Sequence, residues 1–225
     1  MKEFVKKIFT KENMKKFFYS FVWLMVLLFV IDIVTKWAVV NHFGVDGMNH
    51  QYHSDVHNEK YGISHDYDGI TIIKNFCYIG GSINDRAAFS LGPNRVVLLI
   101  ISLVMSIGFI GFYIFQYKKL NTIYKLSLAL MIAGAVGNLI DRAFYWETTT
   151  GFNGVVDWII FVFGDWEFPM FNIADSCLVI GIIIIVIEMI IEEIKEAKKK
   201  AQRGEYKYSP EQLEKKEKDE GSKSE

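Results

Sequence analysis

Long runs of apolar residues alternate along the chain with polar and charged segments. Four of these runs are close to the ~20 residues that an α-helix needs to cross a hydrocarbon core of ~30 Å. They cover about residues 17–40, 96–117, 124–144 and 170–191. The pattern predicts an all-α membrane protein built as a bundle of four transmembrane helices.

Composition and charge add a direction to these spans. Apolar residues make up 51% of the chain, the mean hydropathy is +0.19 and the formal net charge is −1. Lys and Arg gather in the segments 1–16, 117–125 and 192–225. By the positive-inside rule these basic segments are cytoplasmic, and the segments 41–95 and 145–169 are extracytoplasmic.

The two ends of the chain need separate interpretation. The first apolar run is longer than the 7–15 residues of a signal-peptide core and no small-x-small cleavage site follows it, so it is read as a retained span. The charged tail, residues 192–225, has too few apolar residues to form a core. We expect it to be disordered, with its basic start close to anionic lipid.

A shorter pattern lies between the first and second runs. In "GITIIKNFCYIGG", residues 69–81, apolar and polar residues partly alternate and glycines bound the segment. Such alternation indicates β-strands. We therefore expect a small extracytoplasmic β-containing subdomain at the membrane surface.

Histidines and cysteines of this chain have side chains that are typical metal ligands. His50, His53, His57 and His65 lie in one polar stretch. Their spacing lacks an i,i+4 pair on a predictable helix, and the surrounding residues are typical of a solvated loop. Cys77 and Cys177 fall in different regions of the chain, so we expect two buried packing cysteines and neither a disulfide nor a metal site.

Several ionisable and amide residues fall inside or at the rim of the spans. Placing Asp or Lys at mid-membrane costs roughly 2.5–3.5 kcal/mol, so such residues usually have partners inside the bundle. Asp32 and Lys36 are four positions apart on one face of the first span, which predicts an ion pair. In the third span one face carries Asn138, Asp141 and Arg142. The preceding "AGAVG" would allow close approach of a neighbouring helix.

Two further aspartates approach the same rim. Asp157 lies among apolar neighbours in "VVDWI", so burial should raise its pKa. Asn172 and Asp175 are one helical turn apart where the fourth span begins. Two carboxylates held close together share a proton, so that one polarises a carbonyl while the other activates water. This pattern favours aspartic-protease chemistry, with Arg142 placed to meet an oxyanion or a lipid phosphate.

Five segments in order carry a resemblance to a known family. They are "DIVTK" (32–36), "NDRAAFSLG" (84–92), "GNLIDR" (137–142), "VVDWI" (155–159) and "FNIAD" (171–175). In order, topology and spacing they resemble the motifs of the type II signal peptidases, the bacterial lipoprotein signal peptidases. The resemblance extends from the first span to the fourth and leaves only the termini uncovered.

The resemblance implies an aspartic endopeptidase of the bacterial plasma (inner) membrane, with its active site at the extracytoplasmic face. It implies that Asp157 and Asp175 are the catalytic pair and that Asp141 is a structural support. The other supporting or substrate-binding positions that it implies are Asp32, Lys36, Asn84, Asn138, Arg142, Asn172 and Ala174.

The same resemblance implies the substrate and the partners. The substrate is a prolipoprotein whose cysteine carries a diacylglyceryl group, and the cut falls just before that cysteine. No metal or organic cofactor is implied. We expect a monomer in contact with membrane lipid and with no nucleic-acid partner.

The sequence departs from the family pattern in three places. Asp85 and Arg86 follow Asn84 where the family usually has a glycine-containing motif, and Arg adopts a left-handed backbone less readily than Gly. The segment 147–154 and the histidine-containing stretch are insertions on the side of the predicted active site. They could reshape access of the substrate.

Two other classes of function stay open from the residues alone. An ion-coupled transporter would also bury ionisable residues in a bundle, but transporters commonly have internal repeats and broken helices at the midplane. A non-catalytic assembly factor would use polar residues only for helix pairing, and would tolerate Asp157→Asn or Asp175→Asn.

Overall fold

The computed structural model describes residues 11–43, 70–84, 95–144, 154–164 and 166–203. The helices in this part of the chain are α2 (Lys11–Ser20), α3 (Val22–Phe43), α5 (Arg95–Gln116), α6 (Thr122–Phe144) and α7 (Ile173–Gln202). The strands are β1 (Ile70–Ile73), β2 (Cys77–Asn84), β3 (Val155–Phe163) and β4 (Trp166–Phe171). The chain divides into two compact units, residues 1–183 and 184–225. All the residues of the candidate site lie in the first unit.

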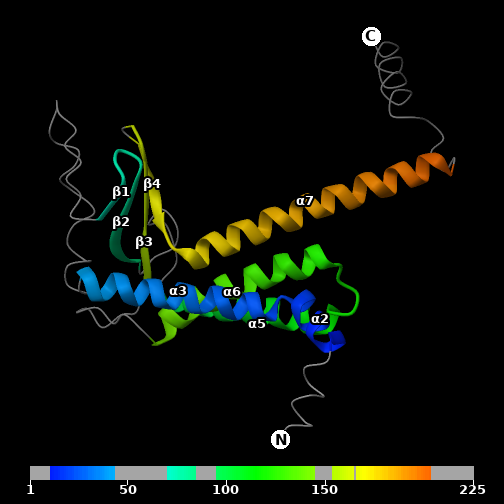
Figure 1. The fold of residues 1–225 in the computed structure, drawn as a ribbon, viewed down its shortest axis with the longest axis horizontal. Coiled ribbons are helices and arrows are strands. Elements are labelled where there is room, and N and C mark those ends of the chain that lie inside the picture. The colour runs from blue at the N-terminus through cyan, green and yellow to red at the C-terminus, as the bar shows by residue number, and fades with distance from the viewer. Residues whose placement is uncertain (1–10, 44–69, 85–94, 145–153, 165, 204–225) are drawn as a thin grey trace, which may run out of the picture. The chain divides into compact units, whose positions relative to one another are not determined.

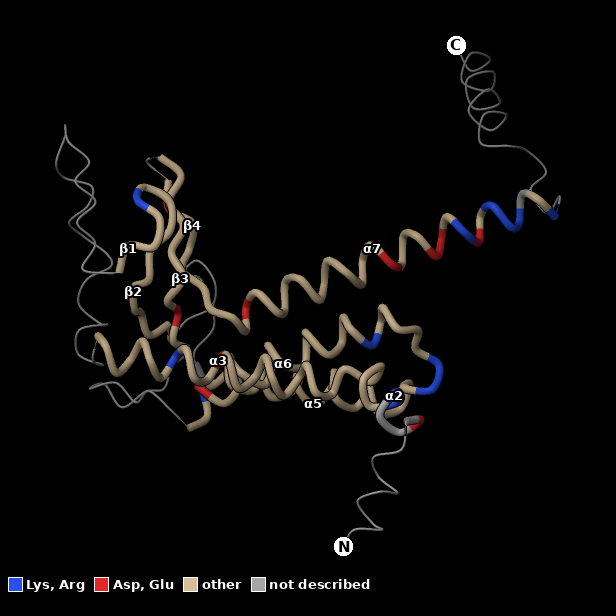
Figure 2. Tube along the Cα trace, viewed as in Figure 1, with Lys and Arg blue, Asp and Glu red and all other residues tan. Residues whose placement is uncertain are grey.

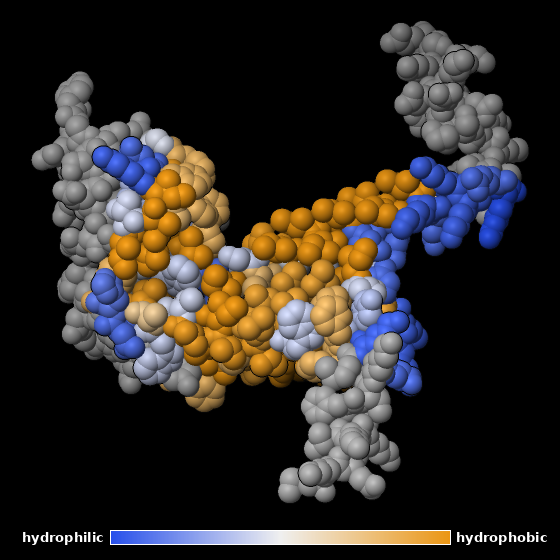
Figure 3. Space-filling model, viewed as in Figure 1, coloured by the Kyte–Doolittle hydropathy of each residue, from blue (hydrophilic) through white to orange (hydrophobic). Residues whose placement is uncertain are grey.

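Four of the helices are long and apolar enough to cross a membrane, namely α3, α5, α6 and α7. This confirms the predicted four-span architecture. Large apolar side chains on the outer faces of α3 and α5 are exposed, among them Val34, Val104 and Ile114 (Figure 3). Such exposure is expected when lipid tails take the place of water around the bundle.

The first predicted span differs from the structure at its N-terminal end. The helix breaks at Phe21, whose φ of 55° is left-handed, so that α2 and α3 are separate helices. The break is held by the Tyr113 hydroxyl, which donates to the Ser20 carbonyl, and by Trp23 Nε1, which donates to the Phe18 carbonyl at 3.1 Å. The span proper therefore begins at Val22 instead of residue 17.

A four-stranded antiparallel sheet with the order β1-β2-β3-β4 lies at one end of the bundle (Figure 1). The predicted β-structure at residues 69–81 is confirmed by β1 and β2. Strands β3 and β4 were not predicted, because strand-like alternation was identified only in residues 69–81. That span starts at Ile173, after β4 has ended.

Helix α6 is the most buried of the four spans and packs against α3 and α5. Its glycines allow a close approach to α7, since a Cβ on Gly134 would lie 2.3 Å from the Ala174 carbonyl oxygen. The role predicted for "AGAVG" is thus confirmed. Helix α7 also continues to Gln202, so residues 192–202 are helical where a disordered tail was expected.

The charged residues are unevenly distributed in the first unit. Lysines lie at α2 and at the α5–α6 connection, at the end of the bundle opposite the sheet (Figure 2). The end that carries the sheet holds the buried ionisable residues described next. The histidine-rich stretch 50–65, Asp85, Arg86 and most of the insertion 147–154 lie outside the described residues.

Candidate active site

Asp175 lies in the first turn of α7, and Asn172 directly precedes the helix. The Asn172 side-chain oxygen accepts a hydrogen bond from the Asp175 backbone N–H at 2.9 Å, and Asp175 Oδ2 accepts one from the Asn172 backbone N–H at 3.2 Å. This reciprocal pair has the form of a capping box. The start of the helix thus fixes the Asp175 carboxylate, and the positive end of the helix dipole favours its negative charge.

Asp157 is brought to the same place by strand pairing. It is the third residue of β3, opposite Ser82 of β2, and is only 4% exposed. Asn84 at the end of β2 donates from Nδ2 to Asp157 Oδ2 at 2.9 Å, and Asn172 donates from Nδ2 to Asp157 Oδ1 at 2.8 Å. Two amide side chains therefore orient this carboxylate.

The environment of Asp157 has the predicted effect on its acidity. Burial, with a further contribution from the negative charge of Asp175, raises the pKa of Asp157 to about 7. Hydrogen bonds from Asn84 and Asn172 and the charge of Lys36 oppose this rise in pKa. A carboxyl group with such a pKa can hold a proton near neutral pH beside a second carboxylate.

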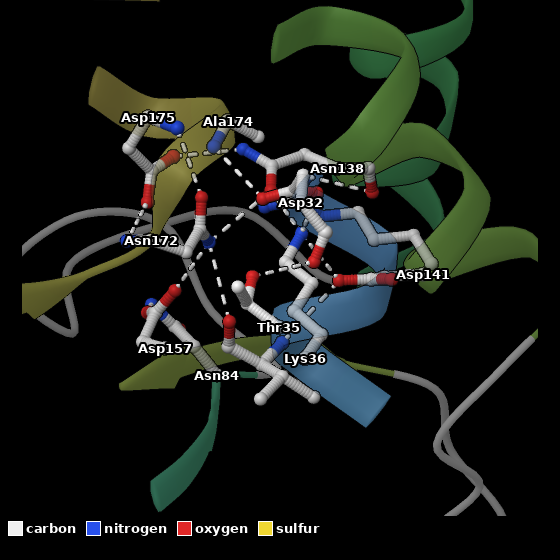
Figure 4. Close-up of polar contacts among 12 residues, drawn as sticks. Asp32, Thr35, Lys36, Asn84, Asn138, Asp141, Asp157, Asn172, Ala174 and Asp175 are labelled. Atoms are coloured by element: carbon white, nitrogen blue, oxygen red, sulfur yellow. Dashed lines mark hydrogen bonds and ion pairs between the residues drawn. The ribbon is translucent and has the colours of Figure 1, made fainter. Parts of the chain in front are cut away.

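A third amide links the Asp175 carboxylate to the interior of the bundle. Asn138 of α6 donates from Nδ2 to Asp175 Oδ1 at 2.7 Å, and its Oδ1 accepts from Lys36 Nζ at 3.2 Å and Asn172 Nδ2 at 3.3 Å. Figure 4 shows these amides between the two aspartates and Lys36. Each of the four carboxylate oxygens of Asp157 and Asp175 thus accepts at least one hydrogen bond.

Beneath the amides lies a buried charged cluster of Asp32, Lys36 and Asp141. Lys36 Nζ is 2.7 Å from Asp32 Oδ2 and 2.8 Å from Asp141 Oδ2, and the three side chains are at most 1% exposed. The ion pair predicted between Asp32 and Lys36 is confirmed. The second pair, between Lys36 and Asp141, joins α3 to α6 and was missed, because sequence spacing reveals only partners on one helix.

The charged cluster also contacts the backbone next to each of the two aspartates. Asp32 Oδ1 accepts from the Ala174 backbone N–H at 2.9 Å, one residue before Asp175. Asp141 Oδ2 accepts from the Val156 backbone N–H at 3.4 Å, one residue before Asp157. The membrane helices therefore hold both segments that carry the aspartates.

Arg142 lies at the side of this arrangement. Its Nη1 donates to Ser102 Oγ of α5 at 3.2 Å and to the Asn138 carbonyl oxygen at 3.5 Å. Ser102 was missed from the sequence, where the only signal is a hydroxyl residue inside an apolar span. All ten residues predicted for the site thus lie in or against one network.

The candidate metal ligands give a separate result. Within the described residues, no three His, Cys, Asp or Glu side chains are grouped as they would be around a metal ion. Cys177 is buried, as predicted for a packing cysteine, whereas Cys77 is only partly buried.

Comparison with known proteins identifies the family. The family model described as signal peptidase (SPase) II matches residues 24–191. Two solved bacterial membrane enzymes are similar in structure, both determined by the in meso method. The structure at 2.3 Å resolution has 27% identity and a TM-score of 0.57, with 76% of this chain and 88% of that chain covered. The structure at 1.9 Å has 28% identity and a TM-score of 0.53, with 75% and 90% covered. This chain is a multi-pass bacterial membrane protein and belongs to the signal peptidase II family, the aspartic peptidases that process lipoproteins.

Proposed function

We propose that Asp157 and Asp175 together activate a water molecule that cleaves prolipoproteins just before the diacylglyceryl-modified cysteine. The observation that carries the proposal is the hydrogen-bonded placement of a buried carboxylate, Asp157, and a partly buried one, Asp175, with the pKa of Asp157 raised to about 7. Such a pair can hold one proton, leaving one acid and one base near neutral pH.

The reaction then follows from the two protonation states. The ionised carboxylate takes a proton from water while the water oxygen attacks the scissile carbonyl carbon. The protonated carboxyl group donates a hydrogen bond to the carbonyl oxygen, on which negative charge develops. Collapse of the tetrahedral intermediate breaks the C–N bond, and the leaving amine receives a proton from the pair.

The surrounding residues support this chemistry in different ways. Asn84, Asn138 and Asn172 hold the carboxylates in position, and the cluster of Asp32, Lys36 and Asp141 anchors the backbone beside them. We assign Arg142 to the developing oxyanion or to a lipid phosphate, because a guanidinium is suited to both. No metal or organic cofactor takes part in the proposed reaction.

The charge distribution supports one orientation in the membrane. Lysines gather at the end with α2 and the α5–α6 connection, so that end faces the cytoplasm under the positive-inside rule. The sheet and the aspartate pair then face outward, where a translocated prolipoprotein presents its modified cysteine. We propose that the enzyme acts as a monomer in the plasma membrane, with both termini cytoplasmic.

The test is cleavage of a diacylglyceryl-modified prolipoprotein peptide by the purified protein in detergent. Asp157→Asn and Asp175→Asn should each reduce cleavage by at least about 100-fold, the scale of a lost acid or base. The matched control is Glu12→Gln, the same chemical change on an exposed residue of α2. A peptide with an unmodified cysteine tests the need for the lipid. Full activity in either aspartate variant would refute the proposed pair.

A further inference from the structure

The Asn138 amide separates the Lys36 ammonium group from the Asp175 carboxylate. Its oxygen accepts from Lys36 Nζ at 3.2 Å, and its nitrogen donates to Asp175 Oδ1 at 2.7 Å (Figure 4). An amide has one accepting end and one donating end. Rotating the amide by 180° would place its nitrogen against the Lys36 cation and its oxygen against the Asp175 carboxylate.

Lys36 permits only one of these two orientations. An ammonium group has donors and no acceptor, so of the two ends of the Asn138 amide only the oxygen can face Lys36. The Asn172 amide favours the same orientation, because its Nδ2 also donates to that oxygen, at 3.3 Å. With Lys36 in place, the Asn138 nitrogen must face Asp175, and Asn138 cannot accept a hydrogen bond from a protonated Asp175.

The hydrogen bonds to the two aspartates are therefore not equivalent. Asp175 accepts from the backbone N–H of Asn172 at the start of a long helix and from an amide whose orientation is set by a cation. Asp157 lies on a strand, where the net dipole is small, and within the described part of the chain its donors are the side-chain amides of Asn84 and Asn172. The arrangement favours negative charge on Asp175 over negative charge on Asp157.

We infer that Lys36 is a positioning residue for the reaction, which acts through the orientation of Asn138 to keep the water-activating charge on Asp175 and the shared proton on Asp157. The inference rests on the proposed function, since it assigns roles within the proposed pair. The ion pairs of Lys36 are with Asp32 and Asp141, its charge lowers the pKa of Asp157 through space, and its hydrogen-bonded path to Asp175 runs through Asn138.

The simpler alternative is that Lys36 only neutralises Asp32 and Asp141. A single Lys36→Met variant would not separate these roles, because it also leaves two buried carboxylates without their cation. The double variant Lys36→Met/Asp141→Asn removes one positive and one negative charge, so the formal charge of the cluster stays as it is in the parent. Asp141→Asn alone, which keeps Lys36, is the matched control.

The measurement is the pH dependence of kcat/KM for cleavage of the diacylglyceryl-modified peptide in detergent. The charged groups that face the pair are Asp32, Lys36, Asp141 and Arg142. In the double variant Asn138 loses the cation that fixes its oxygen, so it can turn and accept a hydrogen bond from a protonated Asp175. The acid limb of the profile should then move up by about one pH unit, a tenfold change in the ionised fraction.

The same variant should separate binding from chemistry. We expect kcat to fall by ~10- to 100-fold, the scale for a misplaced reacting group, with KM little changed. Asp141→Asn alone should not move the acid limb upward, since Lys36 still orients Asn138. If the pH profile of the double variant had its acid and basic limbs at the same pH values as the parent, the inference would be overturned, whatever the level of activity.

A second comparison does not depend on the stability of the Lys36 variant. An asparagine resembles a protonated aspartate, because it is neutral and can donate a hydrogen bond. If Asp157 holds the proton, Asp157→Asn should keep more residual cleavage than Asp175→Asn, by about tenfold or more. The opposite order, or equal residual rates above background, would overturn the inference. Full activity in either aspartate variant would instead overturn the proposed pair itself.

Discussion

Gly137 offers a direct test of how tightly the bundle packs around the site. It lies on α6, and a Cβ at this position would be 2.7 Å from Asp32 Oδ2 and 3.2 Å from the Ala174 Cβ. Contacts under 3.0 Å are essentially never seen for a real Cβ, so something must move. Asp32 cannot move freely, because it is held by Lys36 at 2.7 Å and by the Ala174 N–H at 2.9 Å.

The cost of Gly137→Ala follows from these contacts. Overpacking of a filled interior costs about 1–3 kcal/mol, and loss of a hydrogen bond to a charged group costs about 1.5–3 kcal/mol. Replacing Gly by Ala inside a helix returns about 1 kcal/mol. The net destabilisation is about 1.5–5 kcal/mol, which corresponds to roughly 3–20 °C in the unfolding temperature of a protein of this size.

The assay combines thermal unfolding in detergent with cleavage of the modified peptide. Gly137→Ala should lower both, because the displaced Asp32 holds the backbone next to Asp175. Gly108→Ala is the matched control, since nothing lies within 4 Å of a Cβ there. It should unfold at the parent's temperature or slightly above. If Gly137→Ala behaved like Gly108→Ala in both measurements, the close packing of α6 against Asp32 would be refuted.

Three further predictions concern the buried charges. Asn84→Ala removes a hydrogen bond that lowers the pKa of Asp157, so the basic limb of the pH profile of kcat/KM should move above about pH 7. An unchanged basic limb would show that Asn84 does not influence the pKa of Asp157. Because the folded pKa of Asp157 is about 7 and its ordinary value is 3.8, the folded protein holds a proton that the unfolded chain releases. The free energy of unfolding should therefore fall as pH rises from about 4 to about 7, by up to about 4 kcal/mol for this group. Asp157→Asn should remove this contribution to the pH dependence of the unfolding temperature. Lys36→Met alone leaves Asp32 and Asp141 without their cation and should lower the free energy of unfolding by about 3–5 kcal/mol. The unfolding temperature should therefore fall further in this variant than in the double variant Lys36→Met/Asp141→Asn.

The parts of the fold that could be predicted from the sequence are those set by local patterns. Apolar runs of membrane length identified the four spans, and the i,i+4 spacing of Asp32 and Lys36 identified an ion pair, because both depend on one helix. Asn172 and Asp175 were also predicted to lie one helical turn apart, although the cap that they form at the start of α7 was not predicted. The helix break at Phe21 has no comparable signal, because a left-handed phenylalanine is held by contacts from α5.

The parts that could not be predicted depend on contacts between distant segments. Strand β3 is buried at Val155, Val156 and Asp157 together, so it lacks the alternation that reveals a half-exposed strand. The pairing of Lys36 with Asp141 and of Arg142 with Ser102 joins different helices. Neither pairing can be recognised from the spacing of residues within one span. The family resemblance implied site roles for Lys36, Asp141 and Arg142 but not for Ser102, and the packing of the helices gives these residues their partners.

The buried charged cluster is better explained by positioning than by stability. Removing an ammonium group and two carboxylates from water costs several kcal/mol for each ion, and apolar residues of similar volume often serve stability as well or better. An apolar cluster could not, however, accept hydrogen bonds from the backbone beside each aspartate. Asp32 does so at Ala174, and Asp141 does so at Val156. Nor could it supply the cation that orients Asn138. The cluster is therefore retained, despite its desolvation cost, because it positions Asp157 and Asp175. These two residues come from a strand and a helix, whose local geometry alone would not bring them together.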